Sequence, residues 1–167
     1  MKKMTEKVLG EAFAGESQAH MKYLAFAEVA EREGFKNVGR LFKAIAYAEQ
    51  VHAINHGRNL GYIGKTEENL QKAIDGEVYE VEEMYPSFDA IANLQNEEGA
   101  HRSIHYAIEA EKIHANLYRE AKEKVKEGKD MEIGEIYICP VCGYTHIGKP
   151  PENCPVCRVS SEKFKKF

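Results

Sequence analysis

Two Glu-x-x-His segments, at residues 49–52 and 111–114, contain the side chains best suited to chemistry. Each lies in the middle of a long pattern typical of a helix, where a spacing of three places the carboxylate and the imidazole on one face, a turn apart. A pair arranged in this way can bind one metal ion. Glutamate and histidine are common on solvated helix faces, so the informative feature is that the pair occurs twice.

Additional glutamates lie in the apolar stripes that precede each pair: Glu16 before the first, and Glu77 and Glu80 before the second. Two single glutamates and two Glu-x-x-His pairs, all projecting inward, form the di-iron carboxylate site of ferritin-like four-helix bundles. Buried carboxylates without partners are costly, and neighbouring carboxylates repel one another. Two cations at the centre of the bundle resolve both problems, and we therefore expect a two-metal site.

The elements that must position these residues are four helices, predicted from apolar residues at helical spacing. Their expected ranges are about 4–33, 37–60, 66–96 and 97–127. Gly34 and Gly128 should end the first and fourth helices, and Thr66 is the expected N-cap of the third. Pro86 should kink the third helix one turn back or leave a carbonyl free. Four helices of this length predict a mainly α fold, a four-helix bundle.

The composition changes at Met131, where glycine, proline and cysteine replace the helical pattern. We expect a linker near 128–134, a strand at 136–138, and two domains at 1–130 and 135–167. The second domain contains two Cys-x-x-Cys motifs, and a piece of this size cannot build a core without a metal. Four thiolates fit zinc and iron equally. The ligands are Cys139, Cys142, Cys154 and Cys157.

The charge of the chain excludes several classes of protein. Its net charge is −4 with 30% charged residues, which argues against a general nucleic-acid or anionic-membrane binder. Lys2 and Lys3 are not followed by an apolar run, and no segment approaches the roughly 20 apolar residues that span a bilayer. We expect a cytoplasmic protein, in which cysteines bind metal more often than they form disulfides.

Together these motifs resemble the rubrerythrins, in which a ferritin-like di-iron domain precedes a rubredoxin-like iron centre. The resemblance covers nearly the whole chain. It is carried by residues 14–19, 48–52, 77–86 and 110–114 and by both cysteine motifs. Their joint occurrence in this order is far more specific than any one of them.

The resemblance implies a role for each ligand of the two irons. Glu49 and Glu111 would bridge the irons, Glu16 would bind the first, and Glu77 and His114 would bind the second. Glutamate at the position of Glu77 distinguishes such a site from a plain ferritin or oxygenase site.

The remaining roles are also implied by the resemblance. Glu80 and His52 would alternate as ligands of the first iron, Glu80 when it is oxidised and His52 when it is reduced. Tyr23 and Tyr85 match tyrosines that hydrogen-bond the carboxylates; the residues alone leave them as core tyrosines.

A third iron would be bound by the four cysteines, with backbone N–H groups of each cysteine loop directed at the sulfurs. Gly143 suits the left-handed position after the first loop. Arg158 occupies the corresponding place after the second, and we expect a departure from that loop geometry there.

The implied activity is reduction of hydrogen peroxide. Electrons from NAD(P)H would pass through a reductase, and usually a small rubredoxin, to the four-cysteine iron and then to the di-iron site. The alternatives are a ferroxidase or iron-binding protein, an oxygen reductase, and a scaffold whose C-terminal domain binds zinc.

The short segment between the second and third helices predicts a domain-swapped homodimer. In a ferritin-like bundle these helices are parallel, so the connection from Leu60 to Thr66 would have to climb roughly 33 Å to bring Glu49 level with Glu77. Five extended residues reach only about 20 Å. Pairing the first two helices with the last two of another chain removes this conflict. An all-antiparallel bundle within one chain is the alternative.

Overall fold

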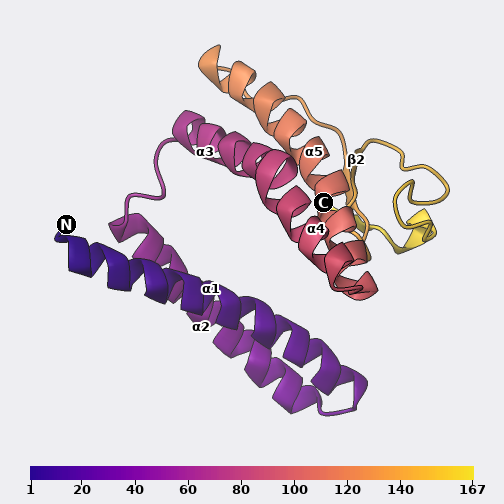
Figure 1. The fold of residues 1–167 in the computed structure, drawn as a ribbon, viewed down its shortest axis with the longest axis horizontal. Helices are drawn as coiled ribbons and strands as arrows, with labels where there is room; N and C mark the ends of the chain where they lie inside the picture. The colour runs from indigo at the N-terminus through magenta and orange to yellow at the C-terminus, as the bar shows by residue number, and fades with distance from the viewer. The chain divides into compact units, whose positions relative to one another are not determined.

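The computed structural model describes residues 1–167. It divides into two compact units, Met1–Gly64 and Lys65–Phe167. Four long helical segments and one small C-terminal sheet make up the chain, so the expected mainly α class is confirmed (Figure 1).

The first unit is an antiparallel hairpin of α1 (Lys3–Arg32) and α2 (Lys36–Asn59) (Figure 1). Gly34, at φ 92°, ends α1 as expected, and the Phe35 N–H closes the turn on the Ala30 carbonyl at 2.8 Å. Small residues let the two helices approach closely. A Cβ added at Gly39 would lie 3.2 Å from the backbone oxygen of Ala27, which is fully buried.

One face of this hairpin remains apolar and exposed. Phe26, Leu41 and Ile45 are 47%, 60% and 42% exposed. Exposed apolar surface of this extent marks an interaction site.

The second unit packs α3 (Thr66–Tyr79) and α4 (Tyr85–Leu94) along α5 (Glu98–Lys126). The first residue of α3 is Thr66, and Lys65 takes the N-cap position with its N–H 3.1 Å from Glu68 Oε2. The prediction that Thr66 is the N-cap was therefore wrong by one residue, because Glu68 captures the preceding N–H. Gly128, at φ 72°, lies just after α5, as expected.

A π-helical segment, η1 (Glu80–Met84), interrupts the third helix between α3 and α4. Within it the Tyr85 N–H reaches back to the Glu80 carbonyl, one residue beyond the α-helical partner. Pro86 lacks an N–H and its ring crowds the carbonyl four residues earlier, which the wider π turn accommodates. The expected disturbance one turn before Pro86 is confirmed, whereas a continuous α-helix over 66–96 is not.

The C-terminal segment forms a three-stranded antiparallel sheet. Its strands are β1 (Ile136–Ile138), β2 (Thr145–Ile147) and β3 (Lys165–Lys166), in the order β2-β1-β3, with a 3₁₀ turn at Ser161–Lys163. Within this segment the most deeply buried side chains are Cys139 and Cys154. Thiols thus form the centre of this small domain. Tyr106 of α5 packs against the same cluster, so the domain rests on α5.

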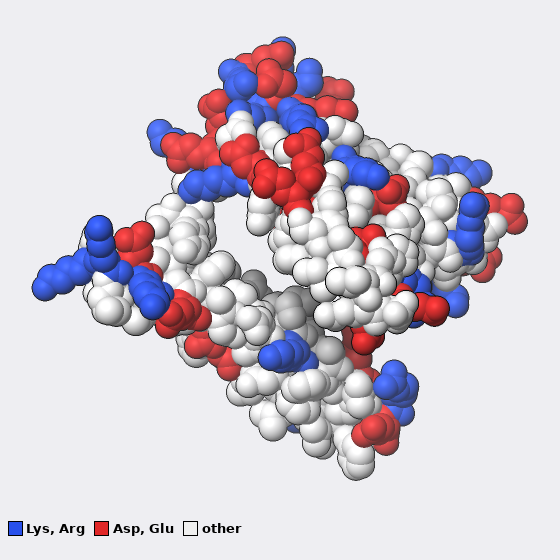
Figure 2. All heavy atoms as spheres, in the orientation of Figure 1, with Lys and Arg blue, Asp and Glu red and all other residues white.

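Charged side chains of both signs are intermixed over the face shown in Figure 2. Neither a basic nor an acidic field dominates that face, in keeping with the small net charge of −4. None of the helices combines the length and apolar character that crossing a membrane requires.

Candidate metal centres

The four cysteine sulfurs converge on one point. Cys139 Sγ lies 3.5 Å from Cys157 Sγ, and Cys142 Sγ lies 3.5 Å from Cys154 Sγ. A disulfide requires about 2.05 Å. A tetrahedral ion with metal–sulfur bonds of about 2.3 Å would separate its sulfurs by about 3.8 Å. All four sulfurs lie within 4.8 Å of one another, which fits a single tetrahedral ion.

The two cysteine loops have the same backbone geometry. The Gly143 N–H donates to the Cys139 carbonyl at 3.0 Å, and the Arg158 N–H donates to the Cys154 carbonyl at 3.0 Å. Their φ angles are 78° and 67°. The expectation that Arg158 would depart from this geometry was wrong. A left-handed arginine costs about 1 kcal/mol or more, and the requirement to close the loop exceeds it.

Backbone N–H groups are directed at the sulfurs. Burial raises the pKa of the Cys142 thiol, although the Tyr144 N–H opposes the change. Burial alone would also raise the pKa of Cys154, but the N–H groups of Cys157 and Val156 favour its thiolate and lower the pKa overall. Donors already aimed at sulfur stabilise the charged ligand form that a metal requires.

In the second unit, Glu77, Glu111 and His114 form a cluster whose ligand atoms lie within 4.8 Å of one another. His114 Nδ1 is 2.5 Å from Glu111 Oε2, across one turn of α5. The pKa of Glu77 is raised to about 8, chiefly by burial and then by its hydrogen bond to Glu111. Without a cation the two carboxyls must share a proton. This donor set therefore fits a hard metal ion in place of that proton.

Glu80, Tyr85 and Tyr118 surround this cluster without belonging to it. Burial, followed by the charge of Glu111, raises the pKa of Glu80. Burial also raises the pKa of the Tyr85 phenol, beside the carboxylates of Glu80, Glu111 and Glu77. The pKa of Tyr118 is raised by burial and then by Glu77 and Glu111. Sequence reasoning gave Tyr118 no role, although it lies two turns beyond Glu111 on the same face of α5.

The first unit holds a matching cluster of Glu16, Glu49 and His52, again within 4.8 Å. His52 Nδ1 lies 3.0 Å from Glu49 Oε2. The His52 side chain is 54% exposed, compared with 27% for His114. Tyr23 lies on the same helix as Glu16 and contacts the rings of Phe26 and Phe42, at 6.2 and 6.1 Å between centroids.

The predicted bundle ligands therefore form two three-residue clusters, one in each compact unit, with Glu80 beside the second. Each cluster contains one Glu-x-x-His pair and one single glutamate. Each is one half of the ligand set expected for two metal ions.

One contact joins the second cluster to the cysteine centre, and sequence reasoning missed it. His114 Nε2 lies 2.7 Å from Thr145 Oγ1, on the first residue of β2. Thr145 stands three residues after Cys142, but the sequence carries no signal that this strand packs against α5.

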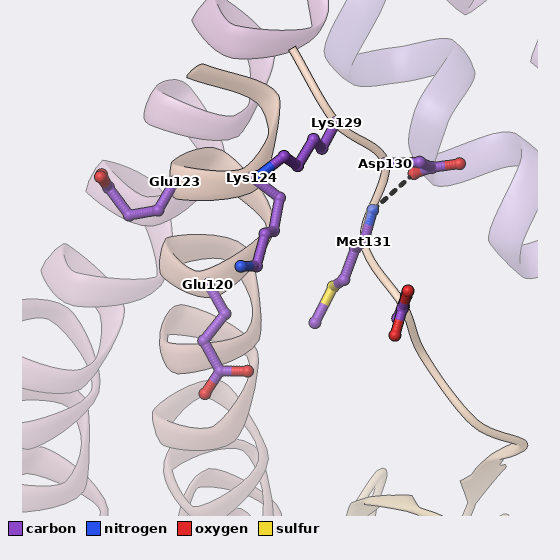
Figure 3. Close-up of a pocket in the computed structure, with 7 residues that line it drawn as sticks. Glu120, Glu123, Lys124, Lys129, Asp130 and Met131 are labelled. Atoms are coloured by element: carbon purple, nitrogen blue, oxygen red, sulfur yellow. Dashed lines mark hydrogen bonds between the residues drawn. The ribbon is translucent and has the colours of Figure 1, made fainter. Parts of the chain in front are cut away.

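A hollow of about 590 Å³ lies away from these ligands, between the end of α5 and the segment that follows it (Figure 3). Lys124 and Met131 extend into the space between helix and linker, and the Met131 N–H donates to Asp130 Oδ1 at 2.8 Å. Its lining mixes acidic and basic side chains and contains none of the predicted ligands.

Comparison with known proteins agrees with this arrangement along the whole chain. The family described as rubrerythrin matches residues 7–122, and the rubrerythrin rubredoxin-like domain matches residues 137–165. Rubrerythrin-2 of Clostridium acetobutylicum is 47% identical over 98% of this chain and 97% of its own length. Nigerythrin of Nitratidesulfovibrio vulgaris is 35% identical over 93% of this chain and 83% of its own. A structure titled as the fully reduced, all-ferrous state of nigerythrin superimposes with a TM-score of 0.58 at 30% identity, covering 98% and 86% of the two chains.

Proposed function

Because this chain belongs to the rubrerythrin family and so has a di-iron site and an Fe(Cys)4 centre, we propose that it reduces hydrogen peroxide to water. Electrons enter at the Fe(Cys)4 centre from an NAD(P)H-linked reductase, directly or through a rubredoxin, and pass on to the di-iron site. Each peroxide consumes two electrons and two protons and yields two waters.

The proposed ligands follow the two clusters. Glu16, Glu49 and His52 come from the first unit, and Glu77, Glu111 and His114 from the second, with Glu80 alternating with His52. When bound, the iron pair supplies two electrons together, as cleavage of the O–O bond requires. The functional domains of this proposal are residues 1–130 for the di-iron site and 135–167 for the Fe(Cys)4 centre.

One observation carries the proposal: the cysteine centre and the Glu77–Glu111–His114 cluster lie in one compact unit, joined by the 2.7 Å contact between His114 Nε2 and Thr145 Oγ1. The four sulfurs belong to the domain that presents Thr145. An iron-storage protein or a hydrolase needs no electron-transfer centre against its metal ligands. The arrangement therefore favours a redox enzyme over an iron store.

Tyr85 and Tyr118 supply protonated hydroxyls around the carboxylates. Because burial and the neighbouring glutamates raise the pKa of both phenols above the ordinary value, each retains its proton at neutral pH. A neutral phenol can donate a hydrogen bond to a bound peroxide oxygen or to a ligand carboxylate.

The complete di-iron site requires both halves, and we propose that they come from two chains in a domain-swapped homodimer. The connection between α2 and α3 comprises Leu60–Lys65. Glu49 lies about 15 Å along the helix axis before the end of α2, and Glu77 lies about 16 Å after the start of α3. If the two helices were parallel with Glu49 and Glu77 level, the connection would have to span about 31 Å along the bundle. Its reach when fully extended is about 25 Å. The exposed apolar face of the α1–α2 hairpin is the surface that the partner's helices would cover.

The experiment is a single turnover followed by stopped flow. Anaerobically reduced protein is mixed with one equivalent of hydrogen peroxide, and reoxidation of the thiolate iron is followed by its visible absorption. Reoxidation far faster than with air supports the peroxidase. Equal rates with peroxide and oxygen would favour a ferroxidase or an oxygen reductase, and a colourless protein would indicate zinc in the cysteine site.

A further inference from the structure

Thr145 belongs to the C-terminal domain but contacts a predicted ligand on α5. Thr145 is the one polar residue that is buried in the chain, with 5% of its surface exposed. Its Oγ1 lies 2.7 Å from His114 Nε2 and 3.2 Å from the Gly143 carbonyl. We propose that Thr145 is a positioning residue of the di-iron site, which holds His114 in the tautomer that leaves Nδ1 free for metal. This inference rests on the proposed assignment of His114 as a ligand.

The positions of the protons at Thr145 determine the tautomer of His114. A threonine hydroxyl has one proton and two lone pairs. Thr145 donates its proton to the Gly143 carbonyl, which has none to give in return. The oxygen of Thr145 can then only accept from His114, so Nε2 carries the hydrogen. Nδ1 is then the nitrogen left for metal, and it lies 2.5 Å from Glu111 Oε2, a contact that holds one proton in the metal-free protein. A metal ion bound between them would replace that proton and bind the Nδ1 lone pair of a neutral imidazole.

The fold fixes this contact from both sides. Ala110 and His114 lie one turn apart on the same face of α5. Ala110 is 3% exposed, and a Cβ added to Gly143 would lie 3.7 Å from the Ala110 Cβ, so the first cysteine loop rests directly on the helix. Gly143, at φ 78°, turns the chain into β2, whose first residue is Thr145. The hydroxyl is therefore held where Nε2 must meet it.

A hydrogen bond to the distal nitrogen of a ligating histidine orients the ring, fixes the tautomer and increases the basicity of the ligand. Here that partner comes from the domain that also binds the other iron. Folding of the cysteine domain thus completes the surroundings of a ligand on the bundle. Val or Ala at position 145 has no hydroxyl and could not accept this hydrogen bond.

The test uses the full-length protein with Thr145→Val, which keeps the branched shape but lacks the hydroxyl, and Thr145→Ser, which keeps the hydroxyl. Thr5→Val, on an exposed residue of α1, is the matched control. Binding of Co²⁺ to the bundle is titrated in protein whose cysteine site already holds iron. We expect affinity to fall about 10–100-fold in Thr145→Val and to stay near wild type in Thr145→Ser and Thr5→Val.

A second readout follows the tautomer itself. In protein loaded with zinc at all sites, imidazole nitrogen–proton spectra should show a slowly exchanging proton on His114 Nε2 in wild type and Thr145→Ser. In Thr145→Val that proton should exchange rapidly. In the iron-containing protein used for the Co²⁺ titration, an unchanged visible spectrum of the thiolate iron in each variant shows that the cysteine domain remains folded.

Wild-type metal affinity in Thr145→Val would overturn the inference, as would an equal loss in Thr145→Ser, which would assign the effect to packing. These results are distinguishable from failure of the proposed function. Loss of affinity in Thr145→Val supports the positioning role even if the wild-type protein does not reduce peroxide. Normal peroxide reduction combined with unaltered affinity in Thr145→Val removes the role of Thr145 and leaves the function intact.

Discussion

Complementation between two inactive variants decides whether one di-iron site takes ligands from one chain or from two. Glu49→Ala removes a ligand from the cluster of the first unit, and Glu111→Ala removes one from the cluster of the second. Each variant alone should lack activity, because Glu49 and Glu111 are the proposed bridging ligands. The informative species is the heterodimer of the two variants.

The expected magnitude follows from which halves meet. In a swapped heterodimer, one site combines both altered halves and the other combines both intact halves. Purified heterodimer should therefore show about half of the wild-type activity per dimer. If each site forms within its own chain, both sites of the heterodimer carry one altered ligand and no activity should return.

Co-expression of the two variants with different affinity tags, followed by sequential purification on both tags, isolates the heterodimer. The assay is peroxide-dependent reoxidation of the reduced thiolate iron. The heterodimer of a doubly substituted chain with a wild-type chain is the control, because its expected result is the reverse. The swapped arrangement leaves it no intact site, whereas sites formed within each chain leave the wild-type site intact and about half of the activity. A heterodimer as inactive as its parents, with iron still present in the cysteine site, would refute the swapped arrangement and favour the antiparallel bundle.

Three further predictions concern the second unit. Because the pKa of Glu77 is raised from 4.5 to about 8, protonation of Glu77 stabilises the metal-free fold at low pH, and this stability is lost as the pH rises towards 8. A metal ion displaces that proton, so the affinity for metal should rise with pH up to about 8. Calorimetry in two buffers should detect release of the proton, and Glu77→Gln should abolish it. Cys154→Ala should remove the visible absorption and make the residues after the linker sensitive to protease, because the thiols are the core of the C-terminal domain. Far-ultraviolet circular dichroism should stay nearly constant, since the helices remain. A protease-resistant variant would contradict this prediction. Ala110→Leu should lower the free energy of unfolding by about 1–3 kcal/mol through overpacking and displace the first cysteine loop from α5. The thermal midpoint should fall and reoxidation of the thiolate iron should become slower. An unchanged midpoint would show that the loop does not rest on α5 at Ala110.

The helices and ligand pairs were predictable from sequence because their causes are local. Apolar spacing located the four helical segments to within a few residues, and positive φ at Gly34 and Gly128 marks two of their ends. A Glu-x-x-His pair lies on one face in any α-helix, so the contacts at 3.0 Å and 2.5 Å required no knowledge of the fold. The spacing of the cysteines likewise sufficed to predict a four-sulfur site.

Predictions from the sequence were wrong or incomplete where two local preferences compete. Arg158 adopts a left-handed conformation because the loop around Cys154 must close, and this requirement outweighs the intrinsic preference of arginine. The π-helical segment at Glu80–Met84 was expected only as a disturbance, since the missing N–H of Pro86 predicts a defect and not its form. Its form matters because Glu80 begins that segment.

The sequence by itself determined the types of the candidate ligands, the pairing of Glu and His along each helix and the clustering of four cysteines in a C-terminal domain, all of which depend on spacing along one element. Only the tertiary structure decided that β2 lies against α5 and so brings Thr145 to His114, 31 residues apart in the chain. It also decided that the pKa of Glu77 is raised, by burial first and then by Glu111, which belongs to another helix. The residue pattern of one element does not predict which other element it will contact, because burial and packing arise only when the chain has folded.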